Sequence, residues 1–197
     1  MKKSEGRKLV VLGIVLVVID QVIKVLVKTN MGLGEQFDVI GNWFKILFVE
    51  NEGMAFGWAF GGKVGKMLLS IFRICLCTAL VLWIRGMCRK NAAARQAGQA
   101  APIPAGVLVG LTLITAGAFG NIIDSLFYGV IWNYAPFLFG KVGDMFYFPL
   151  WTWPDWVPLL GGSIFFEPVF NFADSCVTVG AFYLLLFQWR FFTKSDD

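Results

Sequence analysis

Residues 9–27 read LVVLGIVLVVIDQVIKVLV, and Asp20 and Lys24 are the two charged residues in this run. A helix that spans a bilayer needs about 20 mostly apolar residues, and this run meets that need. It is too long for the apolar core of a cleavable signal peptide, and it lacks a small-residue cleavage site. We therefore predict a membrane-spanning helix here rather than a removable leader.

Three further stretches are long and apolar enough to span a bilayer, at about residues 67–84, 103–123 and 169–189. Together with the first run, they predict a membrane all-α fold built as a bundle of four transmembrane helices. We expect one integral-membrane domain that covers residues 1–197.

The composition agrees with a membrane protein and excludes several other classes. Apolar residues make up 57% of the chain, charged residues make up 15%, and the mean hydropathy is +0.69. A soluble domain carries about 25% charged residues, so disorder, a coiled coil and a basic nucleic-acid-binding domain are excluded. The chain has no histidine, which excludes His-based nucleophile pairs and His-ligated zinc. Its four cysteines form no CxxC pair, so we expect no metal and no cofactor.

The distribution of Lys and Arg predicts the orientation in the membrane. The two terminal tails and the segment between the second and third spans hold Lys2, Lys3, Arg7, Lys8, Arg85, Arg89, Lys90, Arg95, Arg190 and Lys194. Because positive residues favour the cytoplasmic side, both termini should be cytoplasmic. The loops at about residues 28–66 and 124–168 should then lie outside. The net charge of +4 is thus a topology signal, and we expect no nucleic-acid partner.

Two of the segments between the predicted spans, residues 36–50 and residues 91–102, have different sequence patterns. Residues 36–50 alternate polar and apolar side chains around a Gly-Asn turn, a pattern typical of short strands. We expect a small extracytoplasmic β-sheet over the outer face of the bundle. Residues 91–102, on the cytoplasmic side, are rich in small residues and are predicted to be a flexible linker.

Polar residues that a bilayer disfavours gather near the outer ends of the predicted spans. Asp20 and Lys24 are four residues apart and share one helical face. They form either a structural ion pair or part of a substrate site. Asn121 and Asp124 share a face at the end of the third span, after small residues that include Gly120 and permit close helix packing. Because charges in a membrane are costly, this clustering indicates one site at the membrane surface.

Three more positions add to the cluster. Asn51 and Gly53 lie in a segment that favours close backbone approach, although alone it is more typical of a turn than of a site. Asp144 lies among glycine and apolar residues in the second outer loop. Asp174 lies inside the start of the fourth span, three residues after Asn171. A helix-capping role suits Asn171 better, since Asp174 would be a turn too deep.

Without histidine, the available groups favour carboxylate chemistry. Two neighbouring aspartates share one proton; the ionised one activates water and the protonated one polarises a carbonyl. Amide hydrolysis by an aspartic mechanism follows. A Ser-Lys peptidase that uses Lys24 is a weaker alternative, because its span holds no serine and Ser125 belongs to another element. A transporter or channel component that uses the acids as a proton or cation path is the alternative outside enzymology.

Five ordered motifs resemble those of the bacterial lipoprotein signal peptidases (signal peptidase II). The family patterns DQxxK, NxGxAFG, GGxxGNxxD, VVD and NxAD are similar to residues 20–24, 51–57, 117–124, 142–144 and 171–174. The resemblance covers almost the whole chain.

The resemblance implies an aspartic endopeptidase with Asp144 and Asp174 as the catalytic pair. The residues that it places in supporting or binding roles are Asp20, Lys24, Asn51, Gly53, Gly120, Asn121, Asp124 and Asn171. It also implies diacylglyceryl-modified prolipoproteins as substrates, cut just before the lipidated cysteine. Membrane lipid and globomycin-like peptide inhibitors would be further partners. The location would be the bacterial cytoplasmic (inner) membrane, with the active site at the extracytoplasmic face.

The chain also departs from the family pattern. Ser125 stands where an arginine usually follows the third motif, Gly143 replaces the second valine of the fourth, and the stretch between Asp144 and Asp174 is longer than usual. Residues 146–158 within it hold three Trp and three Pro. Proline at this density forbids a regular helix, and no strand alternation survives it. The segment is either a packed loop or an interfacial surface that holds lipid.

Overall fold

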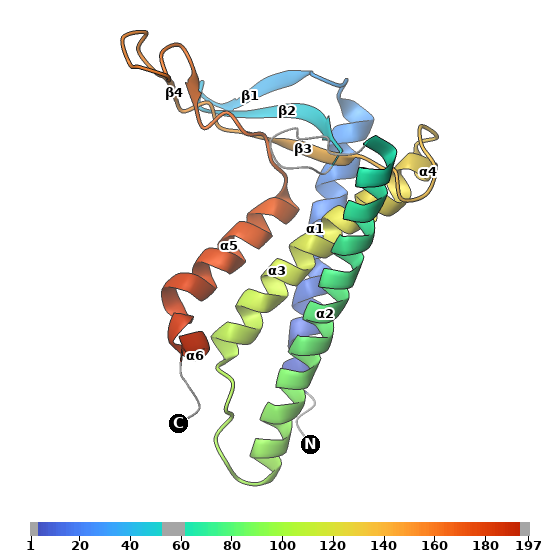
Figure 1. Cartoon of the computed structure of the whole chain (residues 1–197), viewed down its shortest axis with the longest axis vertical. Helices are drawn as coiled ribbons and strands as arrows, with labels where there is room; N and C mark the ends of the chain where they lie inside the picture. Colours follow the sequence, from blue (N-terminus) through green and yellow to red (C-terminus); the bar gives the residue numbers. More distant parts are fainter. Residues whose placement is uncertain (1–3, 53–61, 194–197) are drawn as a thin grey trace.

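The computed structural model describes residues 4–52 and 62–193. Four helices form an elongated bundle (Figure 1): α1 (Ser4–Asn30), α2 (Gly62–Gln96), α3 (Ala105–Ile123) and α5 (Phe172–Phe187). A π-helical turn, η2 (Asp124–Tyr128), and the short α4 (Gly129–Ile131) continue the direction of α3. The short α6 (Trp189–Thr193) follows α5. Each predicted span therefore coincides with a helix.

Among the described residues, three helical segments are long and apolar enough to cross a membrane. They are Glu5–Asn30, Val64–Gln96 and Ala105–Ile131. Helix α5 is apolar too, but it has 16 residues, fewer than the roughly 20 that a perpendicular span needs. It begins at Phe172, three residues later than expected, because Asn171 caps it.

Two connections differ from the prediction. The second outer loop does not begin at residue 124, because η2 and α4 extend the helix to Ile131. The predicted linker at 91–102 begins as helix, since α2 continues to Gln96. Buried Asn91 also connects the two ends of this segment. Its amide donates to the Ile103 carbonyl and accepts from the Ile103 N–H, both at 2.9 Å. Its small residues therefore do not make the whole segment flexible.

A three-stranded antiparallel sheet lies across one end of the bundle, opposite the end where α1 begins and α6 lies (Figure 1). The predicted strands are β1 (Gln36–Ile40) and β2 (Phe44–Asn51), joined at Gly41, whose positive φ of 52° suits glycine. The third strand, β3 (Val142–Tyr147), pairs with β2 and brings Asp144 opposite Val49. The sequence did not predict β3, because this pairing joins residues 91 to 102 positions apart.

The segment 146–158 contributes one strand of a short hairpin, so the expectation that the prolines leave no strand in it was wrong. Strand β4 (Trp151–Thr152) pairs with β5 (Ile164–Phe165). The Trp151 ring stacks on Phe165 with 3.9 Å between centroids. The hairpin projects beyond the sheet and away from the helices (Figure 1). Aromatic stacking supports a pairing that is only two residues long.

Helix α3 is the centre of the bundle and packs against α1, α2 and α5. Its residues Val107, Leu108 and Leu111 form a buried cluster with Leu9 of α1 and Leu184 of α5. Toward the sheet, glycine replaces these large side chains. A Cβ built on Gly117 would lie 2.2 Å from the Ala173 carbonyl oxygen. The α3 and α5 backbones are therefore in direct contact close to Asp174, as small residues permit in membrane helix pairs.

Gly117→Ala is expected to destabilise the folded protein by about 1–3 kcal/mol, because the added methyl group must push α5 away from α3. Thermal unfolding in detergent measures this loss. Gly86→Ala is the matched control, since a Cβ at Gly86 of α2 meets nothing within 4 Å. An unchanged unfolding temperature for Gly117→Ala would contradict the observed backbone contact.

Candidate active site

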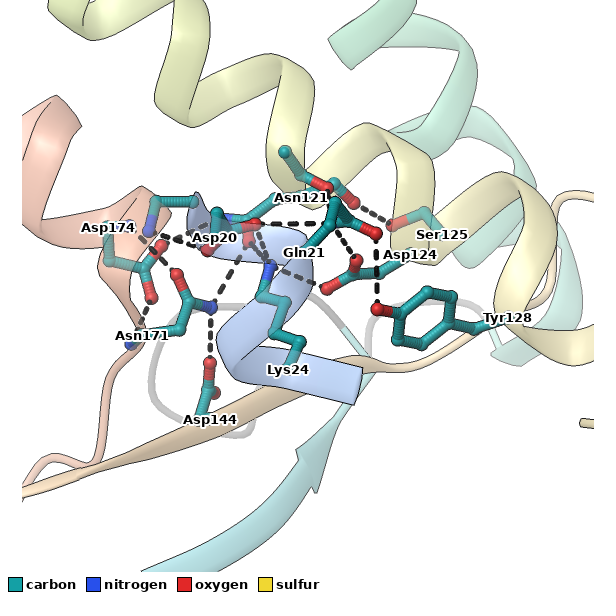
Figure 2. Close-up of polar contacts among 12 residues, drawn as sticks. Asp20, Gln21, Lys24, Asn121, Asp124, Ser125, Tyr128, Asp144, Asn171 and Asp174 are labelled. Carbon is teal, nitrogen blue, oxygen red and sulfur yellow. Dashed lines mark hydrogen bonds and ion pairs between the residues drawn. The ribbon is translucent and has the colours of Figure 1, made fainter. Parts of the chain in front are cut away.

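The site begins with a buried cation on α1. Asp20 and Lys24 are each 1% exposed. The Lys24 ammonium lies 2.9 Å from Asp20 Oδ2 and 2.6 Å from Asp124 Oδ2 (Figure 2). The sequence paired Lys24 with Asp20 one turn away, and the structure adds Asp124 from the end of α3. One lysine thus holds two carboxylates from different helices.

Lys24 also donates to Asn121 Oδ1 at 2.8 Å, so the three donors of its ammonium group have three acceptors. The Ser125 hydroxyl, which is buried, donates to the Asn121 carbonyl at 3.0 Å. A Ser-Lys mechanism needs a neutral amine aimed at the serine oxygen. Because the ammonium is committed to two carboxylates and an amide, the geometry argues against that mechanism.

Gln21, which the sequence analysis did not single out, completes this polar layer. Its amide donates to Asp124 Oδ1 at 2.9 Å and to the Gly120 carbonyl at 3.2 Å, and it accepts from the Tyr128 hydroxyl at 3.1 Å. Gly120 lets Asp20 approach, since a Cβ there would lie 2.6 Å from Asp20 Oδ2. The position of Gln21 beside Asp20 in a predicted span was the available signal.

Asn171 and Asp174 form a reciprocal cap at the start of α5. The Asn171 side chain accepts from the Asp174 N–H at 2.9 Å, and the Asp174 carboxylate accepts from the Asn171 N–H at 3.3 Å. Asp174 is therefore the third residue of the helix, and the expectation that it lies too deep for capping was wrong. A capping box fixes both side chains at the helix entrance.

Two asparagines connect Asp144 to Asp174 (Figure 2). The Asn171 amide donates to Asp144 Oδ1 at 2.6 Å and to Asn121 Oδ1 at 3.1 Å. The Asn121 amide in turn donates to Asp174 Oδ1 at 2.7 Å. The Asn121 oxygen also accepts from Lys24, so the same amide joins the aspartate pair to the buried cation.

Asp144 lies in a setting that favours its protonated form. Its side chain is 3% exposed. Burial, and next the negative charge of Asp174, raise the pKa of Asp144 from 3.8 to about 7, while the bond from Asn171 acts in the opposite direction. A carboxyl group with a pKa of about 7 is partly protonated at neutral pH, so Asp144 can donate a proton. The pair can supply an acid and a base to one reaction.

Of the second motif, residues 51–57, the described residues are 51 and 52. The Asn51 amide, at the end of β2, donates to Asp144 Oδ2 at 3.4 Å. The expectation for Gly53 lies outside the described residues. The structure therefore brings together Asp20, Lys24, Asn51, Gly120, Asn121, Asp124, Asp144, Asn171 and Asp174. Over residues 4–52 and 62–193, no group of three or more metal-ligating side chains is found.

Arg73 of α2 was also missed by the sequence analysis. Its half-buried side chain is acted on by the negative charges of Asp174, Asp144 and Asp124. An arginine inside a predicted membrane span is itself a signal of function. That signal was present in the stretch 67–84 and marks α2 as a fourth helical contributor to the site.

Comparison with known proteins identifies the family to which the chain is similar. Residues 12–190 match the family described as Signal peptidase (SPase) II. A protein of Porphyromonas gingivalis (strain W83) named Lipoprotein signal peptidase is 42% identical over 92% of this chain and 83% of its own length. A Symbiobacterium thermophilum protein of that name is 33% identical over 90% and 91% of the two chains.

A solved structure has a similar fold. It is described as a bacterial membrane enzyme structure by the in meso method at 1.9 Å resolution, and it shares a TM-score of 0.63 and 26% identity with this chain. The similarity covers 95% of this chain and 94% of the other. The family match spans nearly all of the described helices and strands, and it includes both aspartates that the asparagines connect. The chain belongs to the signal peptidase II family of membrane peptidases.

Proposed function

We propose that the protein removes the signal peptide from diacylglyceryl-modified prolipoproteins by cutting just before the lipidated cysteine. The observation that carries this proposal is the connected chain Asp144–Asn171–Asn121–Asp174, which places two carboxyl groups under one hydrogen-bond network. Membership of the family and the printed names of its relatives support the substrate class.

In the proposed reaction, the shared proton rests on Asp144 and Asp174 is ionised. Asp174 takes a proton from a water molecule, whose oxygen attacks the scissile carbonyl carbon. Asp144 donates its proton to the carbonyl oxygen as the tetrahedral intermediate forms. Collapse of that intermediate breaks the C–N bond: Asp174 gives the proton that it took from water to the leaving amine, and a hydroxyl of the intermediate returns a proton to Asp144 as the product carboxyl group forms. The raised pKa of Asp144 suits the acid in this sequence.

The other polar residues of the site hold the aspartate pair in position. Lys24, Asp20 and Asp124 form a buried ion cluster, and Asn121 transmits its position to Asp174. We assign these residues to positioning rather than to proton transfer. Gly120 permits the close approach of Asp20.

We infer four spans, with α5 as a short fourth one, and a cytoplasmic location for both termini. The excess of Lys and Arg at the end of the bundle opposite the sheet supports this orientation. The sheet and the aspartate pair then lie at the extracytoplasmic face of the bacterial inner membrane. Substrate helix and lipid both reside in the bilayer, so a site at this depth meets the bond without extraction.

The transporter alternative finds no support in the family match. A proton path also needs polar groups along the bundle. In the described part of the chain, the aspartates lie near the sheet, and the next buried cluster along α3 is apolar.

The direct experiment is cleavage of a lipidated prolipoprotein by the purified protein in detergent. We expect release of the signal peptide, inhibition by a globomycin-like cyclic peptide and no effect of a chelator. An unlipidated precursor is the control for substrate class. Equal turnover of both precursors would contradict the proposed specificity, and reversal of EDTA inhibition by added metal would contradict the mechanism.

The cleavage rate should depend on the ionisation of Asp144. We expect kcat/KM to fall as the pH rises through about 7, because Asp144, with its pKa raised to about 7, then loses the shared proton. A pH-rate profile measures this, with thermal unfolding at each pH as the control for protein integrity. A rate that keeps rising to pH 9 would contradict the assignment of the acid.

The β4–β5 hairpin offers a candidate surface for the lipid. Trp151 and Trp153 pack against Phe165, whereas Trp156 is 81% exposed. We propose that the tip around Trp156 contacts the outer leaflet and the diacylglyceryl group, since Trp favours the membrane interface.

Trp156→Ser should therefore lower kcat/KM for lipidated substrate by about tenfold, as expected for the loss of one buried aromatic contact. The hairpin itself should remain, because Trp156 takes no part in the stacking around Phe165. Trp156→Phe, which keeps an apolar ring, is the control. Unchanged kinetics in Trp156→Ser would contradict the proposal that the tip contacts the diacylglyceryl group.

A further inference from the structure

Helix α2 turns one narrow face toward the rest of the protein. The buried or half-buried residues along it recur at alternating spacings of four and three: Lys66, Ser70, Arg73, Cys77, Leu80, Ile84, Met87 and Asn91. Most residues between them are exposed, for example Phe72 at 61%. This spacing is that of a helix seam packed on a neighbour. Arg73 therefore belongs to the inward face of α2 and not to its lipid face.

Two contacts fix the height of Arg73 along the bundle. One turn farther from the sheet, the Cys77 thiol lies 3.9 Å from the Thr115 carbonyl of α3. One turn closer to the sheet, the Ser70 hydroxyl donates to the Leu138 carbonyl, in the segment that leads into β3. Arg73 thus faces the stretch of α3 between Thr115 and the sheet, where Asn121 and Asp124 lie.

The charges around Arg73 are unbalanced without it. Lys24 is held by Asp20 and Asp124, and that cluster keeps a net charge of −1. The aspartate pair with one shared proton adds another −1. The negative charges that act on the guanidinium are led by Asp174, followed by Asp144 and Asp124. Because net charge at membrane depth is costly, a cation in this place favours the singly ionised pair over the doubly protonated one.

We propose that Arg73 is a positioning residue of the peptidase, whose guanidinium keeps the Asp144–Asp174 pair singly ionised and so sets the pH range of cleavage. The proposal rests on the proposed function. Its physical basis is that a nearby positive charge favours the ionised form of a carboxyl group.

Other charged and titratable groups lie on the elements packed around the pair. They are Asp20, Lys24 and Lys28 of α1, Glu50 of β2 with Glu52 after it, Lys66 of α2, Asp124 of the turn after α3 with Tyr128, Lys141 before β3, and Cys176 of α5. Lys28 pairs with Glu50 and Lys66 pairs with Glu52. Lys24 and these two lysines are thus ion-paired with carboxylates other than Asp144 and Asp174; the charge of Lys24 also acts on Asp144.

The test compares pH-rate profiles of R73Q and R73K with that of the parent enzyme, on a lipidated prolipoprotein. For R73Q we expect both limbs of the profile to move to higher pH by roughly one unit. On the acid limb this shift means about tenfold lower kcat/KM, because a unit of pKa is a factor of ten in ionisation. The activity should recover as the pH is raised. R73K keeps the charge and should keep the parental limbs.

Arg85→Gln is the matched control. It removes a positive charge from the same helix about 18 Å farther along, at an exposed position, and should leave the profile in place. A loss for R73Q by one factor at every pH, or an unchanged rate, would overturn the proposal.

If R73Q does not fold, R73K alone decides, since a displaced profile with the charge retained contradicts the proposal and parental limbs support it. Failure of the parent enzyme to cleave would count against the proposed function instead.

Discussion

Asp144→Asn and Asp174→Asn are each expected to abolish cleavage of a lipidated prolipoprotein, with a loss on the order of 10⁴-fold or more. The reason is that an acid and a base act as one unit, so either variant removes the mechanism. Asn keeps the size of the side chain and an acceptor oxygen for Asn171 or Asn121. Gel-based cleavage with purified variants measures the loss.

Stability measurements separate a catalytic loss from a folding loss. The pKa of Asp144 is raised to about 7 by burial and Asp174, so its ionised form costs the fold stability as the pH rises from about 4 through 7. Asp144→Asn should therefore be at least as stable as the parent at pH 8. Asp155→Asn, at an exposed position in the β4–β5 segment, is the matched control and should cleave normally. Substantial turnover by either member of the pair would contradict the assignment.

Lys24→Met is expected to give the largest loss of stability, about 3–5 kcal/mol of unfolding free energy. Removing the ammonium leaves the carboxylates of Asp20 and Asp124 buried and facing each other without a cation. It also takes a donor from Asn121, which positions Asp174. Chemical unfolding in detergent, or the unfolding temperature where refolding fails, measures the loss.

Lys28→Met is the matched control, one turn along α1. Lys28 pairs with Glu50 at a partly exposed position, so its loss should cost at most about 1 kcal/mol. Asp124→Ala should fall between the two, because Lys24 then keeps Asp20 as a partner. Equal stability of Lys24→Met and Lys28→Met would contradict the view that the buried cluster holds α1 to α3.

The sequence was sufficient where the signal is local. Apolar runs of spanning length located helices α1, α2, α3 and α5, and polar alternation around Gly41 located the β1–β2 hairpin. The costly polar residues at the ends of those runs, including Asp124 and Asp174, marked the candidate site before any contact was known. These signals need only neighbours within a turn or a strand, so a single chain of letters carries them.

Only the tertiary structure decided which of those residues meet. Strand β3 exists because β2 offers it a partner 91 to 102 residues away, and Lys24 holds Asp124 because α1 crosses α3 at Gly120.

For Asn171, one role is local and another depends on the tertiary structure. Its capping of α5 is local and follows from the motif at residues 171–174. Its bond to Asp144 and the action of the Asp174 charge on Arg73 depend on helix crossings and strand register. Such contacts join segments distant in the chain, and their geometry is fixed by the packing of the whole bundle rather than by any local pattern.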